Sequence, residues 1–155
     1  MIDWLKKAIL KADDRIASLM AVLIVSITVW GVFTRFVLNQ PLKWMEEGAL
    51  SLFVWLTFIG ASSVMKNDGH VSIDLLLEKA PERFRKVLLL IKYVVMLAAV
   101  ILIFVVLGFQ LSVNAGDKIL PILKIPYSYI DFAVPLGGLL ALIHLIRLIV
   151  RTLKS

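Results

Sequence analysis

The chain has 155 residues, of which 61% are hydrophobic, and its mean hydropathy is +0.95. Soluble domains are closer to half apolar, so this composition excludes an ordinary water-soluble fold and indicates one membrane domain over residues 1–155. The lack of cysteine excludes disulfides and thiol chemistry. The net charge of +6 comes from basic residues scattered between apolar blocks, which favours membrane topology over nucleic-acid binding.

Four segments of the chain are long and apolar enough to cross a membrane. A helix that spans the hydrocarbon core, roughly 30 Å thick, needs about 20 apolar residues. The segments are about residues 16–34, 48–65, 87–109 and 130–150. The third holds Lys92 near one end, from which the long side chain can reach the interface. The predicted fold is therefore all-α, with four transmembrane helices.

The distribution of Lys and Arg predicts the orientation of these helices. The N-terminal segment, the second connection and the C-terminal tail together hold 12 of these residues, whereas the first and third connections hold 4. Positive charge collects on the cytoplasmic side of membrane proteins. Both termini are therefore predicted to be cytoplasmic, and the first and third connections are predicted to face outward.

Two amphipathic segments are predicted on the cytoplasmic side. Residues 1–15 gather apolar side chains on one helical face, which predicts a short helix lying on the inner leaflet. Acidic residues interrupt the basic part of this segment, so it is not expected to be a cleaved signal peptide. In the second connection, polar residues recur every four positions and predict another interfacial helix: His70, Asp74 and Glu78.

The third connection is apolar and is interrupted by Gly116, Pro121 and Pro126. Irregular backbone near a membrane needs partners for its polar groups. This connection is therefore predicted to pack against protein at the outer surface.

Glu46 and Glu47 are the most suggestive acids, because they begin the second span. They allow two interpretations: a cation or proton site, or carboxylates placed where the helix dipole favours negative charge, with a structural or subunit-contact role. The second interpretation is favoured, since neither residue lies deep in the membrane. No span has an acid at mid-depth, which argues against a self-sufficient proton-coupled pump.

Trp55 lies nine residues beyond Glu46, which is about 14 Å along a helix. At that depth it is expected to pack against another helix, of this chain or of a partner, whereas Trp44 fits an interfacial aromatic belt. In the fourth span, Ala133, Gly137 and Ala141 form a seam of small residues. The seam suits close packing inside the chain or against another subunit.

Phosphate-binding glycine motifs and zinc-type histidine spacings are absent from the sequence. The two histidines, His70 and His144, fall on different elements and do not suit a bis-histidine haem site. His144 is expected to be a packed or hydrogen-bonded polar residue near the inner end of the fourth span. Catalytic, metal and substrate-binding residues are not expected in this chain.

A series of motifs spans the chain from about residue 16 to residue 144: FTRFV at 33–37, PLKWMEE at 41–47, FVWL at 53–56, GA at 60–61, HVSID at 70–74, PILKIP at 121–126 and VPLG at 134–137. This series resembles the small membrane subunit of tripartite ATP-independent periplasmic (TRAP) transporters. The W-x-E-E element, followed by the Trp, Gly and His positions, is the most specific part of the resemblance.

The resemblance implies a partner relationship rather than an independent transporter. In that family a soluble binding protein captures an organic anion, such as a dicarboxylate, sialic acid or another sugar acid. A large subunit with an elevator motion carries the substrate and Na⁺ sites. The small subunit would add to its fixed scaffold as a rigid, lipid-facing bundle in the bacterial inner membrane. The residues expected to be structural or at the subunit interface are Trp44, Glu46, Glu47, Trp55, Gly60 and Gly137. Arg35 and Lys43 would face outward and could dock the binding protein.

Two other functions are less well supported by the sequence. A self-sufficient four-span exporter would be expected to carry an essential glutamate in its first span, but residues 16–34 contain no acid. A membrane enzyme or haem subunit would need a nucleophile, metal or phosphate motif, and the sequence shows none.

Overall fold

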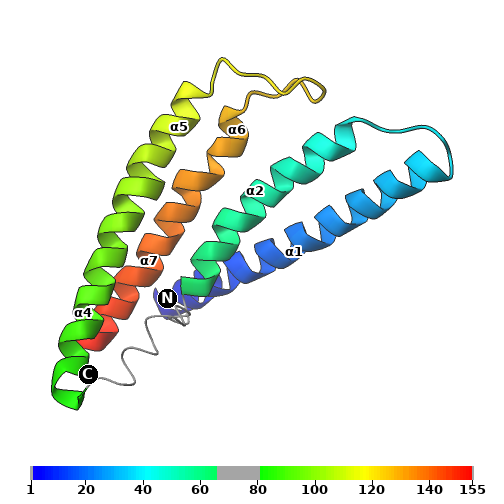
Figure 1. The fold of residues 1–155 in the computed structure, drawn as a ribbon. Helices are drawn as coiled ribbons and strands as arrows, with labels where there is room; N and C mark the ends of the chain where they lie inside the picture. Colours follow the sequence, from blue (N-terminus) through cyan, green and yellow to red (C-terminus); the bar gives the residue numbers. More distant parts are fainter. Residues whose placement is uncertain (1, 66–80, 155) are drawn as a thin grey trace.

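The computed structural model describes residues 2–65 and 81–154. Within these residues the chain is helical and forms no β-strand, so the predicted all-α class is confirmed (Figure 1). The elements in chain order are α1 (Ile2–Phe36), α2 (Trp44–Met65), α4 (Glu82–Ala99), η1 (Val100–Leu107), α5 (Gly108–Asn114), α6 (Ser128–Asp131) and α7 (Ala133–Lys154).

The four predicted spans are confirmed, and each is somewhat longer than the sequence indicated. Four helical stretches are long and apolar enough to cross a membrane: Asp14–Phe36, Trp44–Met65, Val87–Asn114 and Ser128–Leu153. The third consists of α4, η1 and α5, which follow one another without a break in the helix. The fourth consists of α6 and α7. The extra residues lie at the helix ends, where polar side chains can reach the membrane interface.

The N-terminal helix predicted for residues 1–15 is present, but it is not a separate element. It forms the first turns of α1, which continues to Phe36 and is about 52 Å long. Neither glycine nor proline occurs in α1 before Gly31, so nothing ends the helix near Arg15. The position of its first turns on the inner leaflet stays a prediction. The predicted interfacial segment around residues 70–80 lies outside the described residues.

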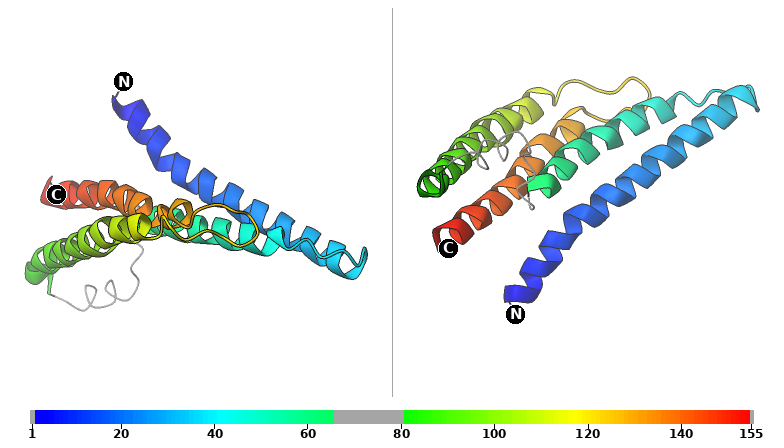
Figure 2. Two further views of the ribbon diagram at one scale, coloured as in Figure 1. Left: turned by 90° about the horizontal axis from the view of Figure 1, so that it is seen from above. Right: turned by 60° about the horizontal axis from the view of Figure 1, so that its bottom comes forward.

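The four spans lie side by side in the order α1, α2, α7 and α4–η1–α5 (Figures 1 and 2). Among the described helices, α1 packs on α2 alone, and the α4–η1–α5 rod packs on α6 and α7. The spans therefore form an open layer with broad faces left for lipid. Lipid solvates apolar helix faces as well as another helix does, so no hydrophobic force closes the layer.

Contacts of α7 hold the centre of this layer. A Cβ atom built on Gly137 would lie 2.7 Å from the carbonyl oxygen of Phe58 in α2, and one on Gly138 would lie 2.7 Å from Cβ of Phe104 in η1. The two glycines thus let the helix backbones approach on both sides of α7. The rings of Phe58 and Phe104 meet edge to face, with centroids 5.9 Å apart.

The small-residue seam of α7 is used inside the chain. Ala133, Gly137 and Ala141 are all buried. Ala141 belongs to a core cluster with Tyr93, Val100 and Leu145. Of the two uses that the sequence left open, the structure therefore shows internal packing.

The middle of the third span, Val100–Leu107, adopts the wider π-helical form. π-Helical turns are rare and usually short. This segment is the part of the rod that faces Gly138 of α7, through Phe104. The sequence VILIFVVL contains no cue for this local widening.

We expect Gly137→Ala to lower the free energy of unfolding by about 1–3 kcal/mol, because its methyl group would overlap the backbone of Phe58. Gly60→Ala is the matched control on α2, since no atom lies within 4 Å of the position its Cβ would take. It should leave stability unchanged or raise it by up to about 1 kcal/mol. Thermal unfolding of the purified chain in detergent, followed by circular dichroism, measures both. Equal effects at the two glycines would contradict the proposed helix contact.

Candidate functional site

The first and third connections lie at the same end of the molecule (Figure 1). This end, called the outer end below after its predicted orientation, holds the start of α2 and most of the candidate residues. The structure contains no membrane, so the orientation itself stays a prediction. The outer end contains an ion pair, a hairpin and two cavities.

Arg35 and Glu46 form an ion pair between α1 and α2. The guanidinium Nη1 lies 3.6 Å from a carboxylate oxygen of Glu46. Their side chains are 61% and 77% exposed, so water screens the pair and its contribution to stability is below about 1 kcal/mol. The sequence treated these residues separately, as a docking residue and an interface residue, whereas the structure brings them together.

Glu47 binds the third connection through its carboxylate. The backbone N–H of Ile122 donates to both carboxylate oxygens at 3.1 Å, and that of Leu123 donates to Oε2 at 2.8 Å. Hydrogen bonds to a charged group are stronger than those between neutral groups, and the two amides together hold the loop against the carboxylate. The structural role predicted for Glu47 thus has a concrete form here: its side chain ties the first turn of α2 to a loop 75 residues away.

The bound loop is a small hairpin over residues 118–127, called the outer hairpin. Tyr127 N–H donates to the Lys118 carbonyl at 2.8 Å, and Leu120 N–H donates to the Ile125 carbonyl at 2.9 Å. At its tip, residues 121–124, Lys124 N–H donates to the Leu120 carbonyl at 3.1 Å. Lys124 has a φ of 57°, the left-handed conformation that closes the tip.

The outer hairpin packs against α2, as predicted for the third connection. Leu120 is buried at 3% exposure. Between the two elements is an apolar cavity of about 210 Å³, lined by Trp55 and Leu52 of α2 and by Leu123 and Ile125 of the hairpin. Trp55 is half-buried there, and Tyr129 of α6 also lines the cavity. Trp55 therefore faces the hairpin and α6 of its own chain, one of the two alternatives left open by the sequence.

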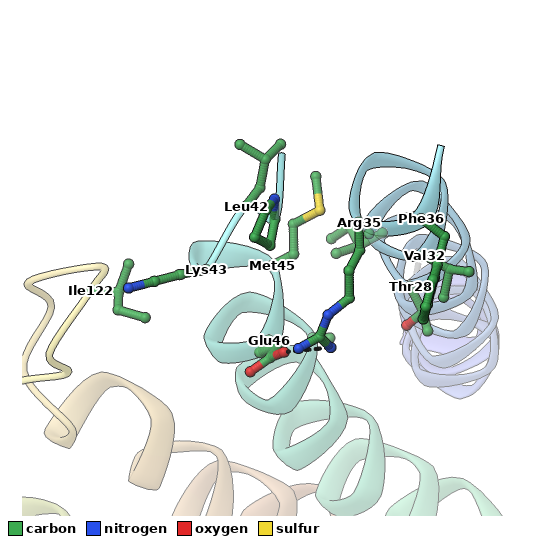
Figure 3. A pocket seen from close by; sticks show the side chains of 13 residues that line it. Thr28, Val32, Arg35, Phe36, Leu42, Lys43, Met45, Glu46 and Ile122 are labelled. Carbon is green, nitrogen blue, oxygen red and sulfur yellow. Dashed lines mark ion pairs between the residues drawn. The ribbon is translucent and has the colours of Figure 1, made fainter. Parts of the chain in front are cut away.

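A larger cavity of about 510 Å³ opens between α1 and α2 (Figure 3). Apolar residues such as Val32 and Met45 line it, together with Arg35, Glu46 and Lys43. In Figure 3 the Arg35 side chain reaches Glu46, whereas the Lys43 side chain runs toward Ile122 of the hairpin tip. The two predicted docking cations thus have different surroundings.

The remaining predicted residues lie elsewhere. Trp44 is 43% exposed at the start of α2, and Gly60 faces open space near the other end of that helix. Gly137 packs within the chain, against α2. His144 is buried in α7, as expected for a packed polar residue, and His70 lies outside the described residues. Among the residues that the structure describes, no group of three or more His, Asp or Glu side chains could hold a metal ion.

Sequence reasoning missed two contacts of the described residues. The Ser63 hydroxyl donates to the carboxylate of Asp14, which ties the inner ends of α1 and α2. The outer hairpin and its Lys124 were also missed as a defined surface. Ser63 and Asp14 are far apart in the chain, and so are Glu47 and the hairpin. The partners of Glu47 are also backbone amides. Side-chain patterns in the sequence therefore contain no signal for either contact.

Comparison with known proteins identifies the family. The profile described as "Tripartite ATP-independent periplasmic transporters, DctQ component" matches residues 24–155. The chain belongs to this family. Its small permease subunits include a protein of Vibrio cholerae serotype O1 named sialic acid TRAP transporter small permease protein SiaQ. That protein is 28% identical over 153 residues, which cover 99% of this chain and 88% of the relative.

Two further relatives match about half of the chain. The C4-dicarboxylate TRAP transporter small permease protein DctQ of the same bacterium is 33% identical over 79 residues, covering 51% of this chain and 34% of the relative. The sialic acid TRAP transporter permease protein SiaT of Haemophilus influenzae is 34% identical over 80 residues, covering 52% of this chain but 13% of that protein. Together with the four apolar helices, these matches identify a multi-pass small permease subunit of the bacterial inner membrane.

We expect Glu47→Gln to release the hairpin tip, because an amide side chain has one acceptor oxygen and presents a donor to the second N–H. Amide hydrogen exchange at Ile122 and Leu123 should become about tenfold faster. Glu46→Gln, which makes the same change one residue earlier, should leave the exchange at both amides as it is in the wild type. Equal protection of the two amides in all three proteins would show that Glu47 does not hold the tip.

Proposed function

We propose that this chain is the scaffold subunit of a sodium-coupled transporter that imports an organic anion. A large elevator-type subunit would hold the substrate and Na⁺ sites, and a soluble binding protein would deliver the anion. The small subunit would widen the fixed part of the large subunit without binding substrate itself. The observation that carries this proposal is the open layer of apolar helices in a chain that belongs to the small permease family.

The interiors of the four spans contain no acidic residue, because Asp14, Glu46, Glu47 and Asp131 all lie in the end turns. Residues 16–34, 48–65, 87–114 and 132–153 contain no Asp or Glu. Proton relays and cation sites inside membranes commonly use such residues. Coupling is therefore assigned to the partner, and the same absence, together with the family membership, disfavours the self-sufficient exporter.

The surface of the layer suits a partner helix as well as lipid. Within residues 14–36 of α1 only Thr34 is buried, whereas seven residues of α7 are buried. Gly60 leaves open space on α2, and small residues are where transmembrane helices approach most closely. Trp44 is exposed at the start of the same helix, the end predicted to lie at the outer membrane surface. These two residues are the proposed contacts with the large subunit.

The relatives support a large partner and an acidic substrate. The SiaT permease of Haemophilus influenzae contains an 80-residue stretch similar to this chain within a protein several times longer. A shared polypeptide supports joint operation of small and large parts. Sialic acids and C4-dicarboxylates, which appear in the relatives' names, are both carboxylate anions. We propose a carboxylate anion of this kind, which includes other sugar acids, as the substrate class.

Co-purification tests the proposed assembly. An affinity-tagged form of this chain, co-expressed with the large subunit, should retain it through detergent extraction and size-exclusion chromatography. Gly60→Phe should reduce the amount of retained large subunit several-fold while the isolated chain keeps its thermal stability, because no atom lies within 4 Å of the position that the Cβ would take. Recovery of the wild-type chain without the large subunit would overturn the proposal, and full recovery with Gly60→Phe would remove Gly60 from the interface.

A further inference from the structure

Resting on the proposed function, we propose that the outer hairpin is a docking surface for acidic side chains of the soluble binding protein. Lys124 at its tip and Lys43 beside it would make the contacts. Glu47 would act as the positioning residue that holds the tip in place. The outer hairpin contains the PILKIP motif, to which no role was assigned from the sequence, and Lys124 replaces Arg35 as the partner of Lys43.

The charges of the outer end favour these two lysines. Arg35 is already paired with Glu46. Lys118 shares a cavity wall with Asp131. Lys43 and Lys124 are both exposed and take part in no salt bridge within residues 2–65 and 81–154. The Glu47 carboxylate is nearby, since it accepts from the amides of Ile122 and Leu123, but it forms no salt bridge with either lysine. Exposed cations of this kind attract an acidic partner and speed its association.

The geometry brings the two lysines to one place. Lys43 precedes α2, and its side chain runs toward Ile122 at the hairpin tip, which lines the same cavity (Figure 3). Lys124 is two residues beyond Ile122. Its φ of 57° disfavours a lysine relative to glycine or asparagine, at a cost of roughly 1–2 kcal/mol. A strained residue that keeps a charged side chain points to a use for that side chain.

Glu47 is what fixes the tip against α2. A two-stranded hairpin is marginal by itself, and this one has a single bridge, between Ile119 and Pro126. The cavity of about 210 Å³ beneath it shows that Leu123 and Ile125 do not fill the space against Trp55. Apolar packing therefore leaves room for the tip to move, whereas the hydrogen bonds to the Glu47 carboxylate define one position.

The test is uptake by proteoliposomes that contain both permease subunits, with the binding protein titrated from outside. Lys43→Gln and Lys124→Asn should each raise the half-saturating concentration of binding protein about three- to fivefold at low salt. Asparagine tolerates the left-handed conformation, so Lys124→Asn removes the charge and keeps the tip. Both effects should shrink at 1 M salt, where the Debye length falls to about 3 Å.

The two glutamates give opposite results if Glu47 positions the surface. Removing either negative charge makes the outer end more positive, so simple electrostatics predicts tighter docking of an acidic partner for both variants. We expect that result for Glu46→Gln, which also releases Arg35. Glu47→Gln should instead raise the half-saturating concentration. In the double variant with Lys124→Asn, the fold-increase in this concentration should be smaller than the product of the two single fold-increases.

Several results would overturn this inference. Unchanged half-saturation for both lysine variants at low salt would remove the docking surface. A lower value for Glu47→Gln would remove its positioning role, as would loss of the large subunit from that variant on purification. A dependence of the lysine effects on the anionic lipid content of the vesicles would assign the lysines to lipid headgroups. Failure of the proposed function is distinct, since the wild type would then show no uptake that depends on the binding protein.

Discussion

The close contact between α2 and α7 at Gly137 determines how the rest of the chain is held. α1 packs on α2, and the α4–η1–α5 rod packs on α6 and α7. The interface between α2 and α7 therefore joins the two pairs into one layer. It relies on van der Waals contact between backbones, because the hydrophobic effect does not favour helix association within lipid. A layer joined in this way keeps broad apolar faces, which a lone protein leaves to lipid and a subunit can share with a partner.

The outer end adds a second constraint of a different kind. There, charge-assisted hydrogen bonds from Glu47 hold a loop that packing alone leaves incompletely supported. The adjacent Glu46 makes only an exposed ion pair with Arg35. Two neighbouring carboxylates of the same helix turn thus have separate tasks. The layer of helices lies in the apolar part of the molecule, and the polar surface lies where a soluble partner is proposed to bind.

The sequence predicted the elements of this fold far better than their arrangement. Apolar run lengths gave all four spans, because the thickness of the membrane sets them. The sequence contained no signal for the order in which the spans lie side by side, because each helix carries apolar residues on all of its faces. The continuity of α1 was readable from its lack of early glycine and proline, but it was missed. Glu47 and Gly137 were named as candidates from the sequence, but their partners, the amides of the hairpin and the backbone at Phe58, give no signal in side-chain patterns.

The central claim is that this chain supports transport without carrying the substrate. Uptake of labelled carboxylate anion into proteoliposomes, driven by a Na⁺ gradient, tests it most directly when the large subunit and binding protein are reconstituted with and without this chain. The account predicts uptake with all three proteins, loss of most of it when this chain is omitted, and no anion binding to this chain alone. Full uptake by the large subunit and binding protein without it, or specific anion binding to the isolated chain, would contradict the account.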